Sequence, residues 1–435
     1  MKKSMKAGLL AAGLVAMAGS ALALTYPLDA YERTGIRRLQ AYSMILDGRM
    51  PGSLAIQPGA RLPYTSIRLR LLGVNDSLDI PADAATDPEL QAGIERIVGR
   101  VHPSYRVSIL DITDPDQPRY ASLRGDQGYI PGSVGKLLVM AGLFNELRRL
   151  HPTNVAAREN VLRSTRVVAD EFAVPNTHEV PIVADDWSRV THRYIGIGDE
   201  FNLWEWVDHM VSPSSNAAGS VVWKEAMLMR AFGRRYPPSP EEAATFFRTT
   251  PKAELTQLSV DVLEEPLIAA GIDPEGLRMR TMFTDGGQRI VPGRSSHATP
   301  RALVRWLVKL EQGQLVDEWS SLEMKRMMYY TRRRYRYAFS PALNEAAVYF
   351  KSGSLYRCAA EEGFTCGQYM GNVENLMHSV AIVESPAGAE NPRVYLISMM
   401  SNVLKVNSAA EHMEIGTQIE RLISTLHPTP TPAGL

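Results

Sequence analysis

Strand-like hydrophobic runs occur near both ends of the chain, and helical spacing of hydrophobic residues dominates its middle. The pattern predicts strands over residues 106–112, 119–123, 347–351, 379–384 and 394–400. Most of residues 151–297 is typical of helices joined by long loops. Strands at both ends with helices between them indicate one sheet assembled from both ends and an inserted helical lobe, which is an α+β fold.

Polar residues at helix starts place several of these helices. Asn202 stands three residues before Glu205 and predicts a helix that runs through Met210. Residues 212–216 interrupt this helix, and the helical spacing then resumes. A second pattern of this kind, Ser408-Ala409-Ala410-Glu411, predicts a last helix that ends near residue 426.

The first 23 residues read as a secretory signal peptide. Three lysines precede the apolar run 7–18, and Ala21-Leu22-Ala23 fits a cleavage site. The apolar run is too short for a comfortable membrane span, so cleavage is favoured over an uncleaved anchor. We therefore expect a periplasmic protein without a stable membrane anchor.

The rest of the chain divides into three parts. Residues 24–86 are rich in turns, with one strand candidate at 66–72, and are predicted to be an N-terminal extension outside the main domain. Residues 87–427 form the main domain, with the helical lobe at about 145–297. The proline-rich tail 428–435 is expected to be disordered.

Composition excludes several classes of function. The chain of 435 residues has 47 basic and 47 acidic residues, which gives no indication of a nucleic-acid partner. Its nine histidines lack metal-binding spacing, and Gly132–Lys136 fails as a phosphate loop because Leu137 stands where Ser or Thr is needed. We expect neither a metal nor a cofactor. Cys358 and Cys366 are expected to form one disulfide that closes a short loop.

A hydroxyl and an amine stand three residues apart at the predicted start of the most apolar helix. Ser133 and Lys136 directly precede the run 137–143, and in the first turn of a helix they would share one face. Burial lowers the pKa of a lysine, and a neutral amine beside a serine activates the hydroxyl as a nucleophile. Taken alone, the pattern also fits a serine that caps a helix.

Two further motifs follow in order. Ser214-Ser215-Asn216 interrupts a helix of the lobe, and Lys351-Ser352-Gly353 ends a predicted strand. With Ser133-x-x-Lys136, they resemble the motif set of the penicillin-recognising serine enzymes, which are the class A β-lactamases and the related DD-peptidases. The resemblance covers residues 88–427. It implies a β-lactamase/transpeptidase-like fold, with an antiparallel sheet flanked by helices and an inserted all-helical lobe.

The resemblance also implies catalytic roles. Ser133 would be the acylated nucleophile, and Lys136 would help to deprotonate it. Ser214 would relay a proton to the leaving nitrogen, and Lys351 would keep Ser214 polarised and attract a substrate carboxylate.

Substrate-binding roles follow in the same way. Asn216 would hold the substrate amide and Ser352 its carboxylate, while Gly353 would let the ligand approach the strand. The backbone N–H of Ser354 would complete an oxyanion hole with that of the nucleophile. His378 lies near the place where class A enzymes position a carboxylate-binding arginine, and it is a candidate for that task or a structural residue.

One expected residue is missing. Class A β-lactamases carry a loop glutamate that activates the deacylating water, and by order it belongs near residues 277–293, where Asp285 is the only acid. Glu264 precedes Leu267 in a similar pattern but stands too early. Acylation is therefore better supported than fast deacylation.

The predicted function is hydrolysis of an amide bond in β-lactams or related peptidoglycan peptides, through an acyl-Ser133 intermediate. The alternatives are a DD-peptidase or penicillin-binding protein, an esterase without efficient deacylation, and a catalytically idle binding protein. The expected partner is a small substrate of this kind. The sequence gives no indication of oligomeric state.

Residues 325–337 alternate basic residues with tyrosines. The plainer interpretation is a solvated helix end whose rings pack inward. The alternative is a surface that binds an anionic polymer and borders the cleft, because the stretch shortly precedes Lys351 in the chain.

Overall fold

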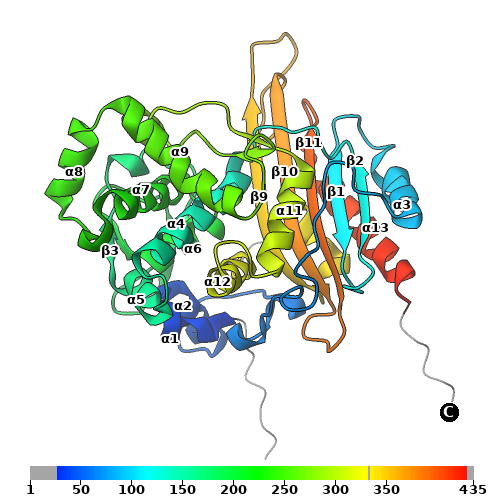
Figure 1. Ribbon diagram of the computed structural model, residues 1–435, viewed down its shortest axis with the longest axis horizontal. Coiled ribbons are helices and arrows are strands. Elements are labelled where there is room, and N and C mark those ends of the chain that lie inside the picture. The colour runs from blue at the N-terminus through cyan, green and yellow to red at the C-terminus, as the bar shows by residue number, and fades with distance from the viewer. Residues whose placement is uncertain (1–26, 332–333, 429–435) are drawn as a thin grey trace, which may run out of the picture.

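A five-stranded antiparallel sheet forms one side of the molecule, and a helical lobe forms the other (Figure 1). The computed structural model describes residues 27–331 and 334–428, so the predicted signal peptide and residues 429–435 of the predicted tail lie outside the described residues. The sheet has the order β2-β1-β11-β10-β9. Its strands are β1 (Arg106–Asp111), β2 (Arg119–Leu123), β9 (Ala347–Arg357), β10 (Glu374–Ser385) and β11 (Arg393–Asn402). Strands from both ends of the chain therefore meet where β1 pairs with β11, as predicted.

Helices cover both faces of this sheet (Figure 1). The outer face carries α3 (Pro88–Val98) and α13 (Ala409–Leu426), and the inner face carries α11 (Pro300–Glu311) and α12 (Glu318–Tyr329). Leu90, Ile94 and Val98 recur every four residues and are buried in one cluster with Ile415 and Ile419. Apolar stripes of this kind fix the two outer helices to the sheet and to each other.

The predicted capping box at the start of α13 is wrong in detail. Ser408 is the N-cap residue, but its side chain accepts no bond from the helix. Its hydroxyl contacts Met377 Sδ at 3.5 Å, and the Glu411 carboxylate accepts a bond from Tyr105 Oη at 2.5 Å. Both side chains hold the helix against the sheet instead of closing its first turn.

The lobe is built around α4, whose apolar positions 137–141 and 143–144 are all fully buried. Its helices are α4 (Lys136–Leu150), α5 (Val155–Ser164), α6 (Leu203–Val211), α7 (Asn216–Phe232), α8 (Pro240–Thr249), α9 (Lys252–Ala269) and α10 (Asp285–Ile290). Short antiparallel pairs join them: β3 (Arg166–Val168) with β6 (Glu200–Asn202), β4 (Val180–Val183) with β5 (Val190–Arg193), and β7 (Leu277–Arg278) with β8 (His297–Ala298). The lobe is thus mainly helical, whereas the prediction was a lobe made of helices alone.

Residues 27–86, hereafter the N-terminal segment, lie against both the helical lobe and the side of the molecule that contains the sheet. They contain α1 (Tyr31–Thr34) and α2 (Arg37–Leu46), and Leu39 is fully buried in the main core. The strand predicted at 66–72 is wrong. Among the described residues, 66–72 pair with no strand, and Leu71 N–H donates to Glu311 O in α11 instead.

Within the described residues, no helix is long and apolar enough to cross a membrane.

Candidate active site

The predicted nucleophile and its base lie at the junction of a 3₁₀ turn and α4. Ser133 belongs to the turn η4 (Gly132–Gly135), and Lys136 is the first residue of α4. Lys136 Nζ lies 2.9 Å from Ser133 Oγ. The lysine side chain is buried, because the helix that follows is apolar on every side, whereas Ser133 is half-buried. The short separation in sequence therefore produces a direct contact.

Lys136 holds two more motif residues. Its Nζ donates to Ser214 O at 2.7 Å and to Asn216 Oδ1 at 2.7 Å, and it lies 3.4 Å from Ser214 Oγ. Burial, with the charge of Lys351 as the second cause, places the pKa of Lys136 well below its ordinary value. A neutral amine has two N–H donors for the two carbonyl oxygens, which leaves its lone pair for the Ser133 hydroxyl. This arrangement suits a general base.

Ser214 connects the two lysines. Lys351, from β9, donates from its Nζ to Ser214 Oγ at 2.7 Å and to Ser352 O at 3.0 Å. Burial, aided by the charge of Arg336, lowers the pKa of Lys351 to about 7. Ser214 itself has a left-handed backbone, with φ of 66°, in the turn between α6 and α7. That conformation costs about 1–2 kcal/mol for a residue other than glycine, so neighbouring contacts have to maintain it.

The β9 backbone passes close to η4, the turn that carries the predicted nucleophile Ser133 (hereafter the nucleophile turn). A Cβ at Gly353 would lie only 2.6 Å from Pro131 O, so the close approach requires glycine. A Cβ at Gly132 would lie 3.4 Å from Ser354 N, which places the Ser354 backbone beside the residue that precedes Ser133. This proximity fits the predicted pair of oxyanion donors, the N–H groups of Ser133 and Ser354.

A cleft of about 740 Å³ opens onto this cluster. Residues of several distant segments line it, including Ser133, Ser214, Ser352, Ser354, Thr177, His178, Tyr335, Arg336 and Tyr369. Arg336 was not singled out from the sequence as a site residue. Its Nη1 donates to Gly353 O at 2.6 Å, and its guanidinium lies 5.4 Å from the Tyr369 ring. The cleft therefore has a fixed cation directly beside the Lys-Ser-Gly strand.

The basic stretch 325–337 contributes to the cleft and to the core. Tyr335 and Arg336 line the cleft, whereas Tyr329, Tyr330 and Tyr337 are buried. Three rings pack inward as expected, but the expected solvated helix end is wrong, because Lys325 and Arg326 are buried as well. The stretch borders the cleft as the alternative expected, and binding of an anionic polymer stays a prediction.

The structure does not bring His378 to the cleft. Its ring is fully buried on β10, where its Nε2 lies 3.0 Å from Ile130 O and its ring stacks on Tyr129 at 6.0 Å. Burial lowers its pKa to about 4, so the ring is neutral and suits a structural position behind the nucleophile turn. Arg336 lines the cleft, whereas His378 does not.

The predicted disulfide between Cys358 and Cys366 is confirmed. It closes a loop in the hairpin that joins β9 to β10. Tyr369, three residues beyond the disulfide, lines the cleft.

An aromatic ring occupies the side of Lys136 that faces residues 279–293. Lys136 Nζ lies 4.7 Å from the centroid of the Phe283 ring. The two acids considered as loop candidates are elsewhere: Asp285 is exposed at the start of α10, and Glu264 pairs with Arg280 at 2.7 Å. Across the described ranges, every hydrogen-bond partner of Lys136 is a hydroxyl or carbonyl oxygen, and none is a carboxylate.

Another cleft wall contains Thr177 and His178, which no sequence motif marked. Asn216 Nδ2 donates to Thr177 Oγ1 at 3.1 Å, and Thr177 Oγ1 lies 2.9 Å from His178 Nδ1. Burial and the charges of Lys136, Lys351 and Arg336 lower the pKa of His178 to about 3, so a neutral imidazole faces the cleft. No local motif marks these residues, because their position depends on the packing of the lobe.

Comparison with solved structures identifies the fold. The TLA-3 extended-spectrum β-lactamase matches with a TM-score of 0.51 and 14% identity, over 78% of this chain and 98% of that chain. A β-lactamase from Sphaerobacter thermophilus DSM 20745 matches with a TM-score of 0.50 and 13% identity, over the same shares. A class A β-lactamase from Bacteroides cellulosilyticus DSM 14838 gives 0.50 and 14%, again over 78% and 98%. No family model and no curated protein matches the sequence. The chain has the β-lactamase/transpeptidase-like fold, as predicted.

Proposed function

We propose that this protein is an exported serine hydrolase that forms an acyl-Ser133 intermediate with β-lactams or with related peptidoglycan peptides. The observation that carries the proposal is the continuous set of contacts from Ser133 through Lys136 and Ser214 to Lys351. Ser214 and Lys351, which contact each other directly, are 137 residues apart in sequence. The disulfide in the β9–β10 hairpin supports export, because such bonds persist in oxidising compartments.

The contacts support acylation step by step. Lys136 takes the proton of Ser133 as Oγ attacks the carbonyl carbon, and the oxyanion that forms lies near the N–H groups of Ser133 and Ser354. The C–N bond of the tetrahedral intermediate then breaks. Ser214 gives its proton to the leaving nitrogen and receives one from Lys136, while Lys351 holds the Ser214 hydroxyl in position. Protons balance, and the amine of Lys136 ends neutral.

The ring of Phe283 supports slow release of the acyl group. Hydrolysis of the ester needs a base that activates water, and an aromatic ring cannot remove a proton. The ring centroid lies 4.7 Å from Lys136 Nζ. The hydrogen-bond partners of this lysine among the described residues include no carboxylate. We therefore favour a DD-peptidase or penicillin-binding activity, in which a β-lactam remains bound, over a fast β-lactamase.

Labelling with a fluorescent penicillin tests the nucleophile. Wild-type protein should be labelled covalently, and Ser133→Ala should not be. Ser164→Ala is the matched control, because it removes a surface hydroxyl that bonds Asn160 on the same helix. Undiminished labelling of Ser133→Ala would overturn the assignment.

Burst stoichiometry tests the release step. With a chromogenic cephalosporin, the reaction should stop after about one equivalent per protein, since a trapped acyl-enzyme turns over only once. Sustained turnover would contradict slow release while leaving the nucleophile assignment intact.

A further inference from the structure

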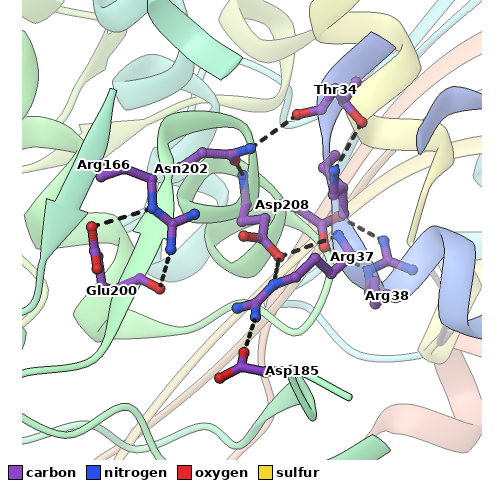
Figure 2. A network of polar contacts seen from close by, with 10 residues as sticks. Thr34, Arg37, Arg38, Arg166, Asp185, Glu200, Asn202 and Asp208 are labelled. Atoms are coloured by element: carbon purple, nitrogen blue, oxygen red, sulfur yellow. Dashed lines mark hydrogen bonds and ion pairs between the residues drawn. The ribbon is translucent and has the colours of Figure 1, made fainter. Parts of the chain in front are cut away.

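The N-terminal segment binds α6 along one face (Figure 2). Three of its polar groups meet the N-cap residue of α6 and two residues of the helix, at successive steps of three residues: Thr34 with Asn202, Arg37 with Glu205, and Arg38 with Asp208. Residues at this spacing share one side of a helix, so the three contacts lie along the same side of α6. The other end of α6 leads directly into the turn that carries Ser214.

Arg38 makes the most buried of these contacts. Its Nε donates to Asp208 Oδ2 at 2.5 Å and its Nη2 to Asp208 Oδ1 at 2.6 Å, and the two side chains are 2% and 0% exposed. The Arg38 Nη2 also donates to Tyr330 O at 2.8 Å, where α12 ends. A guanidinium supplies this fork of donors in a fixed plane, which a lysine ammonium does not.

The two elements joined by Arg38 both lead to the cleft. Asp208 O accepts from Ser212 N at 2.8 Å, and Ser212 Oγ donates to Tyr330 O at 3.4 Å, so the Ser214 turn and the end of α12 are tied at one point. Six residues beyond Tyr330, the chain places Arg336 in the cleft. One guanidinium therefore lies at the root of two cleft segments.

We propose that Arg38 is a positioning residue of the active site, which holds the Ser214 turn against the end of α12. The proposal rests on the proposed function for its catalytic readout. The left-handed backbone of Ser214 needs such external support, and a displacement of about 1 Å at a catalytic group lowers rates by up to 100-fold. The N-terminal segment is then part of the catalytic unit.

Paired apolar substitutions test the proposal without leaving a buried charge. Replacing a buried ion pair by apolar residues is often neutral for stability, so Arg38→Met with Asp208→Leu should stay folded. The matched control is Arg37→Met with Glu205→Leu, which removes the neighbouring pair between the same two helices. Melting temperatures of both variants should stay close to that of the wild type.

Two readouts then separate positioning from mere packing. The acylation rate constant with penicillin should fall at least tenfold in the Arg38 variant and stay within twofold in the control. Hydrogen exchange of the amides of residues 211, 212 and 214–216 should accelerate in the Arg38 variant alone. Equal behaviour of the two variants in both readouts would overturn the proposal. If wild-type protein does not react with penicillin, the proposed function fails, and the exchange comparison still decides the role of Arg38.

Discussion

Lys351 should lower the stability of the fold at neutral pH. Burial lowers its pKa from 10.5 to about 7, and the charge of Arg336 adds to the effect. Between these two values the unfolded chain binds more protons than the folded one, so stability rises with pH across this window. The lowered pKa of Lys351 therefore reduces the free energy of unfolding by its full amount below the folded-state pKa, and this reduction vanishes above the unfolded-state pKa.

The size of this cost follows from the shift. At pH 7 it is about 4 kcal/mol, from roughly three pKa units at about 1.4 kcal/mol each. Lys351→Met removes it together with the bonds to Ser214 Oγ at 2.7 Å and Ser352 O at 3.0 Å, which are worth about 1 kcal/mol each. The variant should be more stable than wild type by about 2 kcal/mol at pH 7, equal near about pH 9, and less stable by about 2 kcal/mol near pH 10.5.

Urea unfolding followed by tryptophan fluorescence, at intervals from about pH 6 to pH 10.5, measures this difference. The stability gain of Lys351→Met should decline by about 1.4 kcal/mol per pH unit above pH 7. Lys405→Met, at a half-exposed lysine paired with Glu361, is the control and should show no comparable trend. A variant that is less stable than wild type at pH 7, or a difference that is flat with pH, would refute the reasoning that Lys351 is a strongly desolvated amine.

Three further substitutions probe the cleft. Phe283→Glu places a carboxylate beside Lys136 and should shorten the acyl-enzyme lifetime by roughly 100-fold, measured as release of labelled penicillin; an unchanged lifetime contradicts the account of slow release. Gly353→Ala puts a Cβ 2.6 Å from Pro131 O and should cost about 1–3 kcal/mol of stability by urea unfolding and slow acylation, whereas wild-type behaviour would show that the strand can retreat. Arg336→Met should weaken binding of a penicillin about tenfold, but leave binding of its methyl ester unchanged, in competition assays; equal losses would exclude a carboxylate contact.

Local patterns predict the parts of this fold that depend on local structure. Strand alternation and helix caps placed β1, β11 and α6, and each motif lies at the element junction that its chemistry needs. The strand predicted at 66–72 was wrong because this segment pairs with no described strand, and its Leu71 N–H bonds to Glu311 O of α11 instead.

Residues that approach the site through tertiary packing left no local signal. Arg336 and Phe283 reach the lysines from loops whose paths depend on the packing of α12 and of the lobe. His378 pairs with Gly353 across β9 and β10, yet its side chain contacts Ile130 O behind the nucleophile turn. The sequence position of His378 therefore predicted its place beside the Lys-Ser-Gly strand, but not that its ring points away from the cleft.

Several departures from ordinary folding preferences meet at one place. A left-handed serine, two neighbouring buried lysines and a close approach that only glycine allows all surround Ser133. Each opposes stability, and together they arrange the groups that acylation requires. The side of Lys136 that faces Phe283 shows ordinary apolar packing instead. Unfavourable geometry is thus concentrated on the Ser133 side of Lys136, and this distribution agrees with the proposed acylation and slow release.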